Sequence, residues 1–227
     1  MRINRHPGMV VRYVRSAPGT YVWLAMLFVT TVAVHHMSPE FEREFLRERS
    51  TNIEGLSENP VRVLFASALL IDGGIWLPYV FLYSVFHAQA ERWLGTLRWL
   101  VVCVTAHVLA TLISESAVLL AMWDGRAPAS TAGTQDIGVS YALAGVVGVL
   151  VYRIARPWRF WYLAGVLLVY GVPLVVGRTF TDFGHFVSLL IGFACHPLTR
   201  GRGEAWNPKE TLAALRARLA DRVAGRH

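Results

Sequence analysis

Apolar residues are grouped along the chain in long stretches that contain no Asp, Glu, Lys or Arg. Each stretch is near the roughly 17–25 residues with which a helix crosses the hydrocarbon core of a bilayer, and such runs are typical of transmembrane helices. The pattern predicts an all-α membrane protein with six spanning helices. Their expected places are Tyr21–Met37, Leu64–Phe86, Trp99–Ile113, Val139–Tyr152, Phe160–Val176 and Phe183–Leu198.

The composition agrees with this class of protein. Hydrophobic residues make up 54% of the 227 residues and charged residues only 16%, whereas an average soluble domain has about 25% charged residues. So little charge cannot cover a globular surface, which excludes soluble and disordered proteins. Cys103 and Cys195 lie inside predicted spans without the spacing of a metal or redox motif, so no metal site and no cofactor is expected.

The basic residues predict how the chain is threaded. Cytoplasmic segments of membrane proteins retain Lys and Arg, and with the N-terminus inside, only six of the 22 Lys and Arg residues fall in outer segments. Both termini are therefore expected in the cytoplasm, in a multi-pass protein of a bacterial plasma membrane. This topology explains the net charge of +7, so nucleic acid is not an expected partner.

The chain divides into a membrane domain between two basic tails. Residues 1–19 form the cytoplasmic N-terminal tail, residues 20–198 the six-span domain, and residues 199–227 the cytoplasmic C-terminal tail. The Glu-rich first outer loop, residues 38–59, is expected to be a partly helical flap on the outer surface. The second outer loop, about Ser114–Asp136, is expected to be mobile because much of it is Ala, Gly, Ser and Thr.

The C-terminal tail carries a helix start signal. Asn207 offers a cap, Pro208 suits the first helical position, and Glu210 suits the third. Leucines then recur at helical spacing with arginines between them. The tail therefore predicts a basic amphipathic helix, which is expected to lie on the anionic inner leaflet of the membrane.

Polar side chains inside spans are costly, so they are candidates for function. Ser140 lies two residues after Gly138 at the start of the fourth span, and His185 one residue after Gly184 at the start of the sixth. Both helices run inward from the outer face, so at about 1.5 Å per residue the two side chains are expected at similar depth. A serine and a histidine at one depth form a candidate nucleophile–base pair. The alternative is that His185 only donates to a neighbouring carbonyl.

Small residues at every fourth position predict that the fourth and sixth spans pack closely. Such faces let membrane helices approach backbone to backbone. Helix packing alone is a sufficient explanation of them, so they carry no chemistry by themselves. The residues are Ser140, Ala144 and Gly148 in the fourth span, and Gly184, Ser188 and Gly192 in the sixth.

Four short motifs follow one another in the membrane domain. They are Arg62 in the first loop region, Glu91-Arg92-Trp93-Leu94-Gly95, Gly138-Val139-Ser140 with Gly145, and Gly184-His185 with Ser188 and Gly192. In this order they resemble motifs of the rhomboid intramembrane serine proteases and their rhomboid-like relatives. The resemblance extends over about Asn59–Leu198.

The resemblance implies a rhomboid-type bundle that hydrolyses a peptide bond in or near a transmembrane helix of a substrate. Ser140 would be the nucleophile and His185 the general base. The substrates or clients would be single-span or multi-span membrane proteins. The first outer loop would shape the rim of the cavity, and the fifth span would lie at its lateral entry.

The chain departs from the family pattern around the dyad. Family proteases carry a His-x-x-x-Asn pair on the second helix that helps to hold the oxyanion, and its two positions fall at Ile75 and Tyr79. Only the Tyr79 hydroxyl could donate there, and losing one such donor costs about 10²–10³ in rate. The residue after the serine is the bulky Tyr141 instead of a small one, and it could fill the cavity.

Two acids precede the dyad residues. Asp136 and Asp182 stand four and three residues before Ser140 and His185, and one of them could orient His185 as the third member of a triad does. Helix capping is the alternative role.

Two functions stay open, and with them the question whether the protein is an enzyme. One is a serine-type intramembrane endopeptidase, and the other is a catalytically inactive rhomboid-like protein that binds transmembrane helices of clients.

Overall fold

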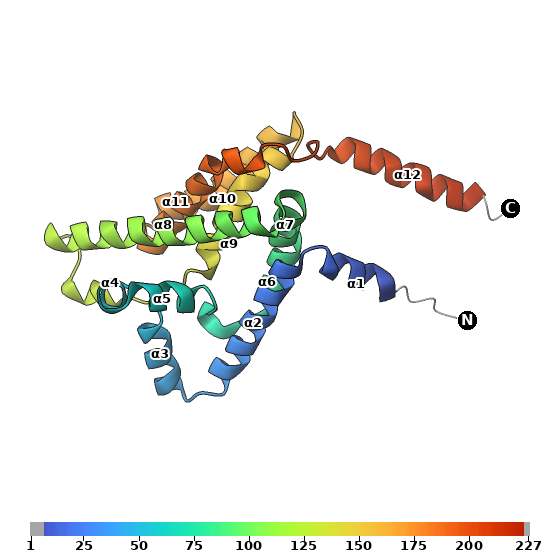
Figure 1. The fold of residues 1–227 in the computed structure, drawn as a ribbon. Coiled ribbons are helices and arrows are strands. Elements are labelled where there is room, and N and C mark those ends of the chain that lie inside the picture. Colours follow the sequence, from blue (N-terminus) through green and yellow to red (C-terminus); the bar gives the residue numbers. More distant parts are fainter. Residues whose placement is uncertain (1–6, 225–227) are drawn as a thin grey trace.

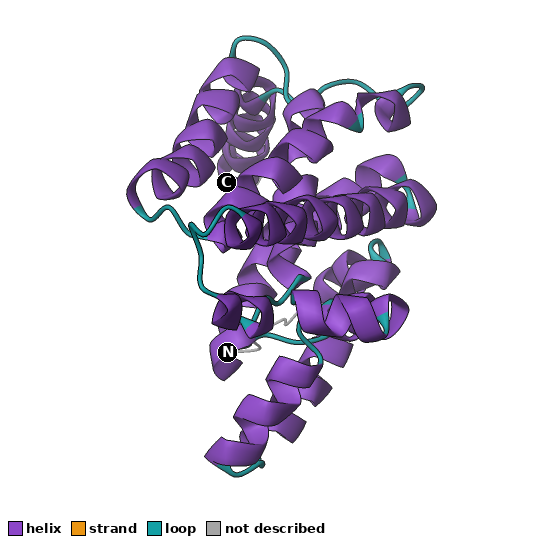
Figure 2. Ribbon diagram, turned by 90° about the vertical axis from the view of Figure 1, so that its left-hand side faces the viewer, coloured by secondary structure: helices purple, strands orange, loops and turns teal. Residues whose placement is uncertain are grey.

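The regular elements of residues 7–224, the part of the chain that this computed structural model describes, are helices (Figures 1 and 2). In chain order they are α1 (Pro7–Arg15), α2 (Pro18–His35), α3 (Pro39–Glu48), α4 (Ile53–Glu58), α5 (Pro60–Ser67), α6 (Leu77–Leu82), α7 (Ala88–Leu94), α8 (Thr96–Trp123), α9 (Val139–Val149), α10 (Trp158–Val176), α11 (Phe180–Ala194) and α12 (Pro208–Ala224).

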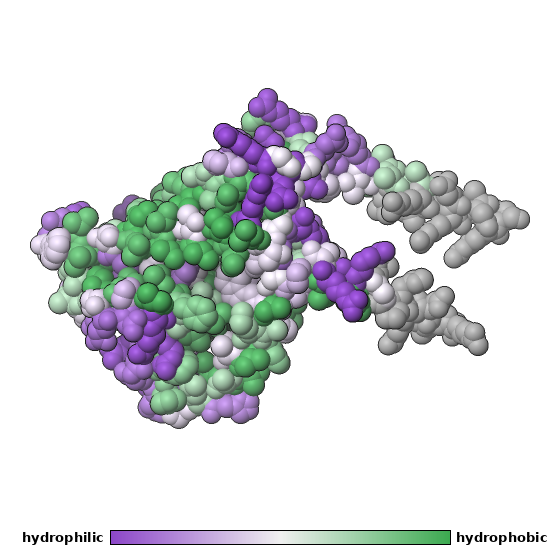
Figure 3. All heavy atoms as spheres, in the orientation of Figure 1, coloured by the Kyte–Doolittle hydropathy of each residue, from purple (hydrophilic) through white to green (hydrophobic). Residues whose placement is uncertain are grey.

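Three of the described helices, α2, α8 and α10, are long and apolar enough to cross a membrane. The segments Val139–Arg153, which is α9 with a 3-10 turn at its end, and Phe180–Ala194, which is α11, are apolar but shorter. Five of the six expected spans therefore coincide with apolar helices. The surface between the two polar ends of the molecule is largely apolar, as Figure 3 shows, and it includes the outward face of α10.

The second expected span, Leu64–Phe86, is wrong as a continuous helix. Helix α5 ends at Ser67, and the chain then passes through a 3-10 turn at Asp72–Gly74 before α6 begins at Leu77. Gly73 and Gly74 have φ angles of 71° and 64°, in the left-handed region that glycine adopts without strain. From Leu77 the helix continues through a π-helical turn, Tyr83–His87, to the end of α7.

The third expected span, Trp99–Ile113, is only about half as long as the observed helix. Helix α8 has 28 residues and continues to Trp123, so residues 114–123, which were expected in the second outer loop, are helical. Glu115 is the reason for the error, because a single charge in an otherwise apolar run does not end a helix. The second outer loop therefore begins at Asp124 and is shorter than expected.

The first loop, residues 38–59, contains α3 and α4, and α5 follows it directly. Each of these three helices begins with a polar side chain that accepts a hydrogen bond from the backbone of the first turn. Ser38 accepts from Phe41 N, Asn52 accepts from Gly55 N, and Asn59 accepts from Arg62 N. The short helices are thus defined by local caps, and they pack beside the bundle at one end (Figure 1).

Helix α9 lies at the centre of the bundle, packed between α8 and α11. Every residue of α9 is buried except Ser140, which is half-buried. Because glycines supply both contact faces, the helices meet through their backbones. A Cβ added at Gly148 would lie 2.5 Å from the Leu189 carbonyl oxygen, and one added at Gly145 would overlap the side chain of Ala106 on α8.

Glu91 on α7 holds the N-terminus of α2. Its carboxylate accepts hydrogen bonds from Gly19 N at 2.9 Å and from Thr20 N and Thr20 Oγ1, each at 2.7 Å. It also accepts from Thr96 Oγ1 at 2.7 Å, at the start of α8. Glu91 is only 2% exposed, and the first N–H groups of a helix lack partners of their own. One carboxylate therefore joins the ends of three helices.

Both terminal helices leave the bundle at the same end (Figure 1). Helix α12 begins as expected at Pro208, where Asn207 accepts from Lys209 N and donates to Glu210. Just before α12, Trp206 is hydrogen-bonded to the turn between α9 and α10: its N–H donates to Arg153 O, and its carbonyl oxygen accepts from Ala155 N.

Candidate active site

The structure places Ser140 and His185 in contact. Ser140 is the second residue of α9, directly after the first turn opens at Gly138, and His185 lies in the second turn of α11. His185 Nε2 and Ser140 Oγ are 2.8 Å apart, and both side chains are half-buried. With Nε2 unprotonated, the serine hydroxyl donates to the imidazole, which is the arrangement of a nucleophile and its base.

A cavity of about 160 Å³ opens at this pair, between α9, α10 and α11. Its polar lining consists of Ser140, His185 and Asp182. Its other lining residues are Leu143 from α9 and Val169, Tyr170 and Pro173 from α10. The resemblance placed the fifth span, which is α10, beside the cavity, but nothing in the pattern of an apolar span indicates which of its faces lines it.

Small residues fix the helices on either side of the pair. Gly192 lies against the backbone of Gly145, where a Cβ would overlap the Gly145 carbonyl oxygen. Ser188 donates from its hydroxyl to Tyr141 O at 2.5 Å and is fully buried, as is Ala144. At the start of α9, a Cβ on Gly138 would overlap the ring of His107, so the first turn of this helix lies directly under α8.

Tyr141 turns away from the cavity. Its hydroxyl donates to the carboxylate of Asp136, at 3.0 Å from Oδ1 and 2.9 Å from Oδ2. Its ring is fully buried and lies edge-on to the ring of His185, with 5.1 Å between the centroids. The expectation that this bulky side chain fills the cavity is therefore wrong: the absent side chain of Gly184 leaves room for the ring, and a Cβ there would overlap it.

Neither of the two second-helix positions, Ile75 and Tyr79, is among the residues that line the cavity. Tyr79 is on α6, packed against the cluster of buried residues around Leu24 and Tyr83. Ile75 lies before α6 and is 64% exposed. The chain is interrupted between α5 and α6, so neither position belongs to a continuous second span.

The two acids have different partners. Asp182 forms a capping box with Thr179, accepting from Thr179 N at 3.2 Å and from Thr179 Oγ1 at 2.7 Å, while Asp182 N donates to Thr179 Oγ1. Asp136 precedes α9, and burial raises the pKa of its carboxyl to about 6, against the hydrogen bonds from Tyr141 and Thr51. Asp182 therefore caps α11 at the cavity, and Asp136 contacts His185 only through Tyr141.

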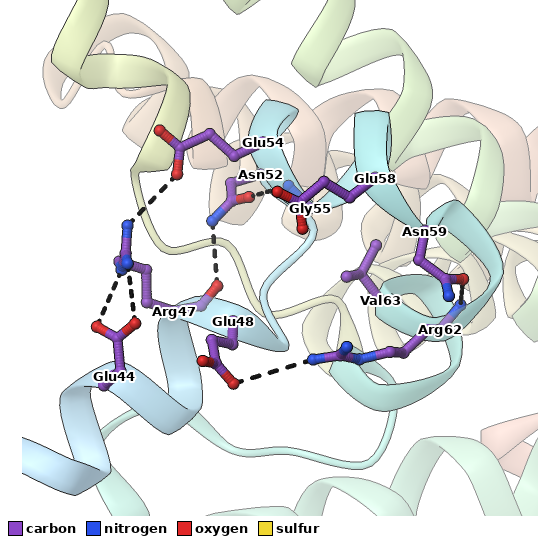
Figure 4. Close-up of a pocket in the computed structure, with 10 residues that line it drawn as sticks. All are labelled: Glu44, Arg47, Glu48, Asn52, Glu54, Gly55, Glu58, Asn59, Arg62 and Val63. Carbon is purple, nitrogen blue, oxygen red and sulfur yellow. Dashed lines mark hydrogen bonds and ion pairs between the residues drawn. The ribbon is translucent and has the colours of Figure 1, made fainter.

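A second cavity, of about 350 Å³, lies among α3, α4 and α5 (Figure 4). Arg47 pairs with Glu44 at 2.9 Å and with Glu54 at 3.4 Å, and Arg62 approaches Glu48 at 3.9 Å. The hydrogen bond from Arg47 lowers the pKa of Glu44. These pairs connect the three short helices, and Arg62, the residue in the first-loop motif, belongs to this bracing and not to the dyad.

The fold and the site define a helical membrane protein with a serine–histidine pair near the start of two closely packed helices. A family described as rhomboid-like protein matches residues 12–205 by its sequence profile. The match covers most of the chain, and the protein belongs to this rhomboid-like family. No match was found among curated proteins or among solved structures.

Proposed function

We propose that this protein is an intramembrane serine endopeptidase, with Ser140 as nucleophile and His185 as general base. The observation that carries the proposal is the 2.8 Å contact between Ser140 Oγ and His185 Nε2 at the wall of a cavity. A membrane protein that only packs helices does not need such a pair, and polar groups at membrane depth are costly to keep.

The reaction follows from the geometry. As Ser140 Oγ attacks the carbonyl carbon of the scissile peptide bond, its proton passes to His185 Nε2, and His185 then protonates the leaving amine. The acyl group on Ser140 is released when His185 takes a proton from water, the resulting hydroxide attacks the acyl carbon, and His185 returns the proton to Ser140 Oγ as the ester bond breaks. The N–H groups of Val139 and Ser140, the first two residues of α9, have no carbonyl partner within the helix and are the nearest candidates to hold the oxyanion.

The substrates of this reaction would be single-span or multi-span membrane proteins. Support comes from α10, which lines the cavity with Val169 and Tyr170 and presents apolar side chains such as Leu168 and Val172 outward. A substrate helix that lies against this face reaches the dyad without crossing a polar surface. The location would be the plasma membrane with both termini in the cytoplasm, where the basic helix α12 could bind the anionic inner leaflet.

A second function has an observation in its favour. Ile75 and Tyr79 leave the cavity without the second-helix donors that support the oxyanion in family proteases. A catalytically inactive protein that binds transmembrane helices of clients has no need of them. The hydrogen bonds of Tyr141 to Asp136 and Ser188 also hold this part of the bundle in one conformation, as a rigid binding protein requires.

Labelling with a fluorophosphonate distinguishes the two functions. We expect the purified protein in liposomes to be labelled at Ser140, because only a serine activated by a base reacts rapidly with this reagent. Ser140→Ala and His185→Ala should both abolish labelling, and Ser130→Ala, in an exposed loop, should leave it unchanged. Folded wild-type protein that resists the reagent, beside a rhomboid protease that reacts, would reject the peptidase and favour the client-binding protein.

A further inference from the structure

The ring of His185 is held from one side by Tyr141. The two rings meet edge-on at 5.1 Å, and Tyr170 lies farther away at 6.3 Å. The hydrogen bond to Ser140 fixes only one point of the imidazole, so the ring could still tilt about that point. A neighbour that cannot move would prevent this, and Tyr141 is such a neighbour.

Tyr141 is fixed at both ends. Its backbone carbonyl accepts from the Ser188 hydroxyl on α11, and its own hydroxyl donates to both carboxylate oxygens of Asp136. The ring between these points passes over Gly184, the residue directly before His185. Any movement of this ring therefore breaks a buried hydrogen bond or collides with α11.

Asp136 is held in turn by the first loop. Its backbone oxygen accepts from Thr51 N and from Ser50 Oγ, both at 2.9 Å, and its N–H donates to Ser50 Oγ. Ser50 and Thr51 are fully buried in the turn between α3 and α4. That turn belongs to the braced group of helices around Arg47 (Figure 4). Glu115 on α8 lines the same small cavity as Asp136 and Tyr141.

We propose that Tyr141, anchored by Asp136, is a positioning residue that sets the orientation of the His185 imidazole toward Ser140. The first loop, through Ser50 and Thr51, fixes the anchor. This inference rests on the proposed function in so far as the orientation matters for catalysis, while the positioning itself is a property of the fold. The tyrosine hydroxyl touches no reacting atom, so its effect reaches the reaction only through His185.

The test compares two tyrosines that each donate one hydrogen bond. Tyr141→Phe keeps the ring and removes the bond to Asp136, while Tyr162→Phe removes a comparable bond to Val147 O on the other side of α9. One readout is the rate at which diethyl pyrocarbonate modifies His185, followed by mass spectrometry across pH. The second readout is the rate of fluorophosphonate labelling at Ser140.

We expect Tyr141→Phe to change the rate and the pH profile of His185 modification and to slow Ser140 labelling by about tenfold, since misorientation of a catalytic group is costly. Tyr162→Phe should leave both readouts unchanged. Asp136→Ala should act like Tyr141→Phe, and the double variant should be no worse than either single one, because both remove the same interaction.

The two proposals fail in different ways. Modification of His185 does not require catalysis, so it reports on positioning even in a protein whose serine is unreactive. If Tyr141→Phe leaves His185 modification as in the wild type, or if Tyr162→Phe changes it equally, Tyr141 is not a positioning residue. An unreactive Ser140 in wild-type protein would instead reject the peptidase. Thermal unfolding of each variant identifies those that do not fold.

Discussion

Gly192 on α11 rests on the peptide group of Gly145 on α9, so closely that a methyl group at position 192 would overlap the Gly145 carbonyl oxygen. This contact is what brings the two helices, and with them His185 and Ser140, to hydrogen-bonding distance. Small residues in membrane helices permit such approach of backbones. The distance within the pair therefore depends on a contact between residues that have no side chains.

Gly192→Ala should lower the free energy of unfolding by about 1–3 kcal/mol, the usual cost of overpacking a tight contact. The matched control is Gly165→Ala on α10, where nothing lies within 4 Å of the added carbon. Thermal unfolding in detergent, followed by tryptophan fluorescence, measures both variants. Equal unfolding temperatures for the two would contradict the close contact of α9 and α11.

Asp136 should make the stability depend on pH in a defined direction. Burial raises the pKa of its carboxyl to about 6, above the value of about 3.9 in an unfolded chain. The folded state thus binds the proton more tightly, and the stabilisation that this gives is complete at pH below 4 and is lost as the pH rises through 6.

Relative to Asp136→Asn, which cannot titrate, the wild type should therefore lose about 2 kcal/mol of stability between pH 4.5 and pH 7.5. Unfolding of both proteins by denaturant at the two pH values measures this difference. If the wild type and Asp136→Asn differ in free energy of unfolding by the same amount at both pH values, Asp136 has an ordinary pKa in the folded protein.

The proposed orientation predicts which ends of the molecule react outside the cell. A cysteine in place of Ser130, in an exposed loop, should react with a membrane-impermeant maleimide in intact cells, and one in place of exposed Ala217 on α12 should react only after permeabilisation. The native Cys103 and Cys195 are buried, so the wild type provides the background. Reaction of the Ala217 variant in intact cells, without reaction of the Ser130 variant, would invert the orientation.

Hydropathy was sufficient to find most of the apolar helices, since the lipid-facing and buried residues of a span are both apolar. It could not find the interruption before α6, because this depends on the left-handed φ angles of Gly73 and Gly74. Hydropathy also predicted an end of α8 just before Glu115, whereas the helix continues past this charged residue to Trp123.

The pairing of Ser140 with His185 could be inferred from helix direction and rise, since the two residues follow the starts of their expected spans, Val139 and Phe183, by one and two positions. The contact of Tyr141 with Asp136 could not be inferred in the same way. It depends on where the tyrosine ring points, which is decided by the space above Gly184 on another helix. Spacing along one helix carries no information about such space.

The carboxylate of Glu91 has a consequence for the order in which the protein is assembled. Thr20, whose N–H it accepts, lies 71 residues earlier in the chain, so the ribosome has long since completed α2 when Glu91 is made. Helix α2 is thus made while the N–H groups of Gly19 and Thr20 still lack their carboxylate partner. The carboxylate can join α2 to its neighbours only after α7 and the start of α8 have been made, so a chain interrupted before that point lacks this connection.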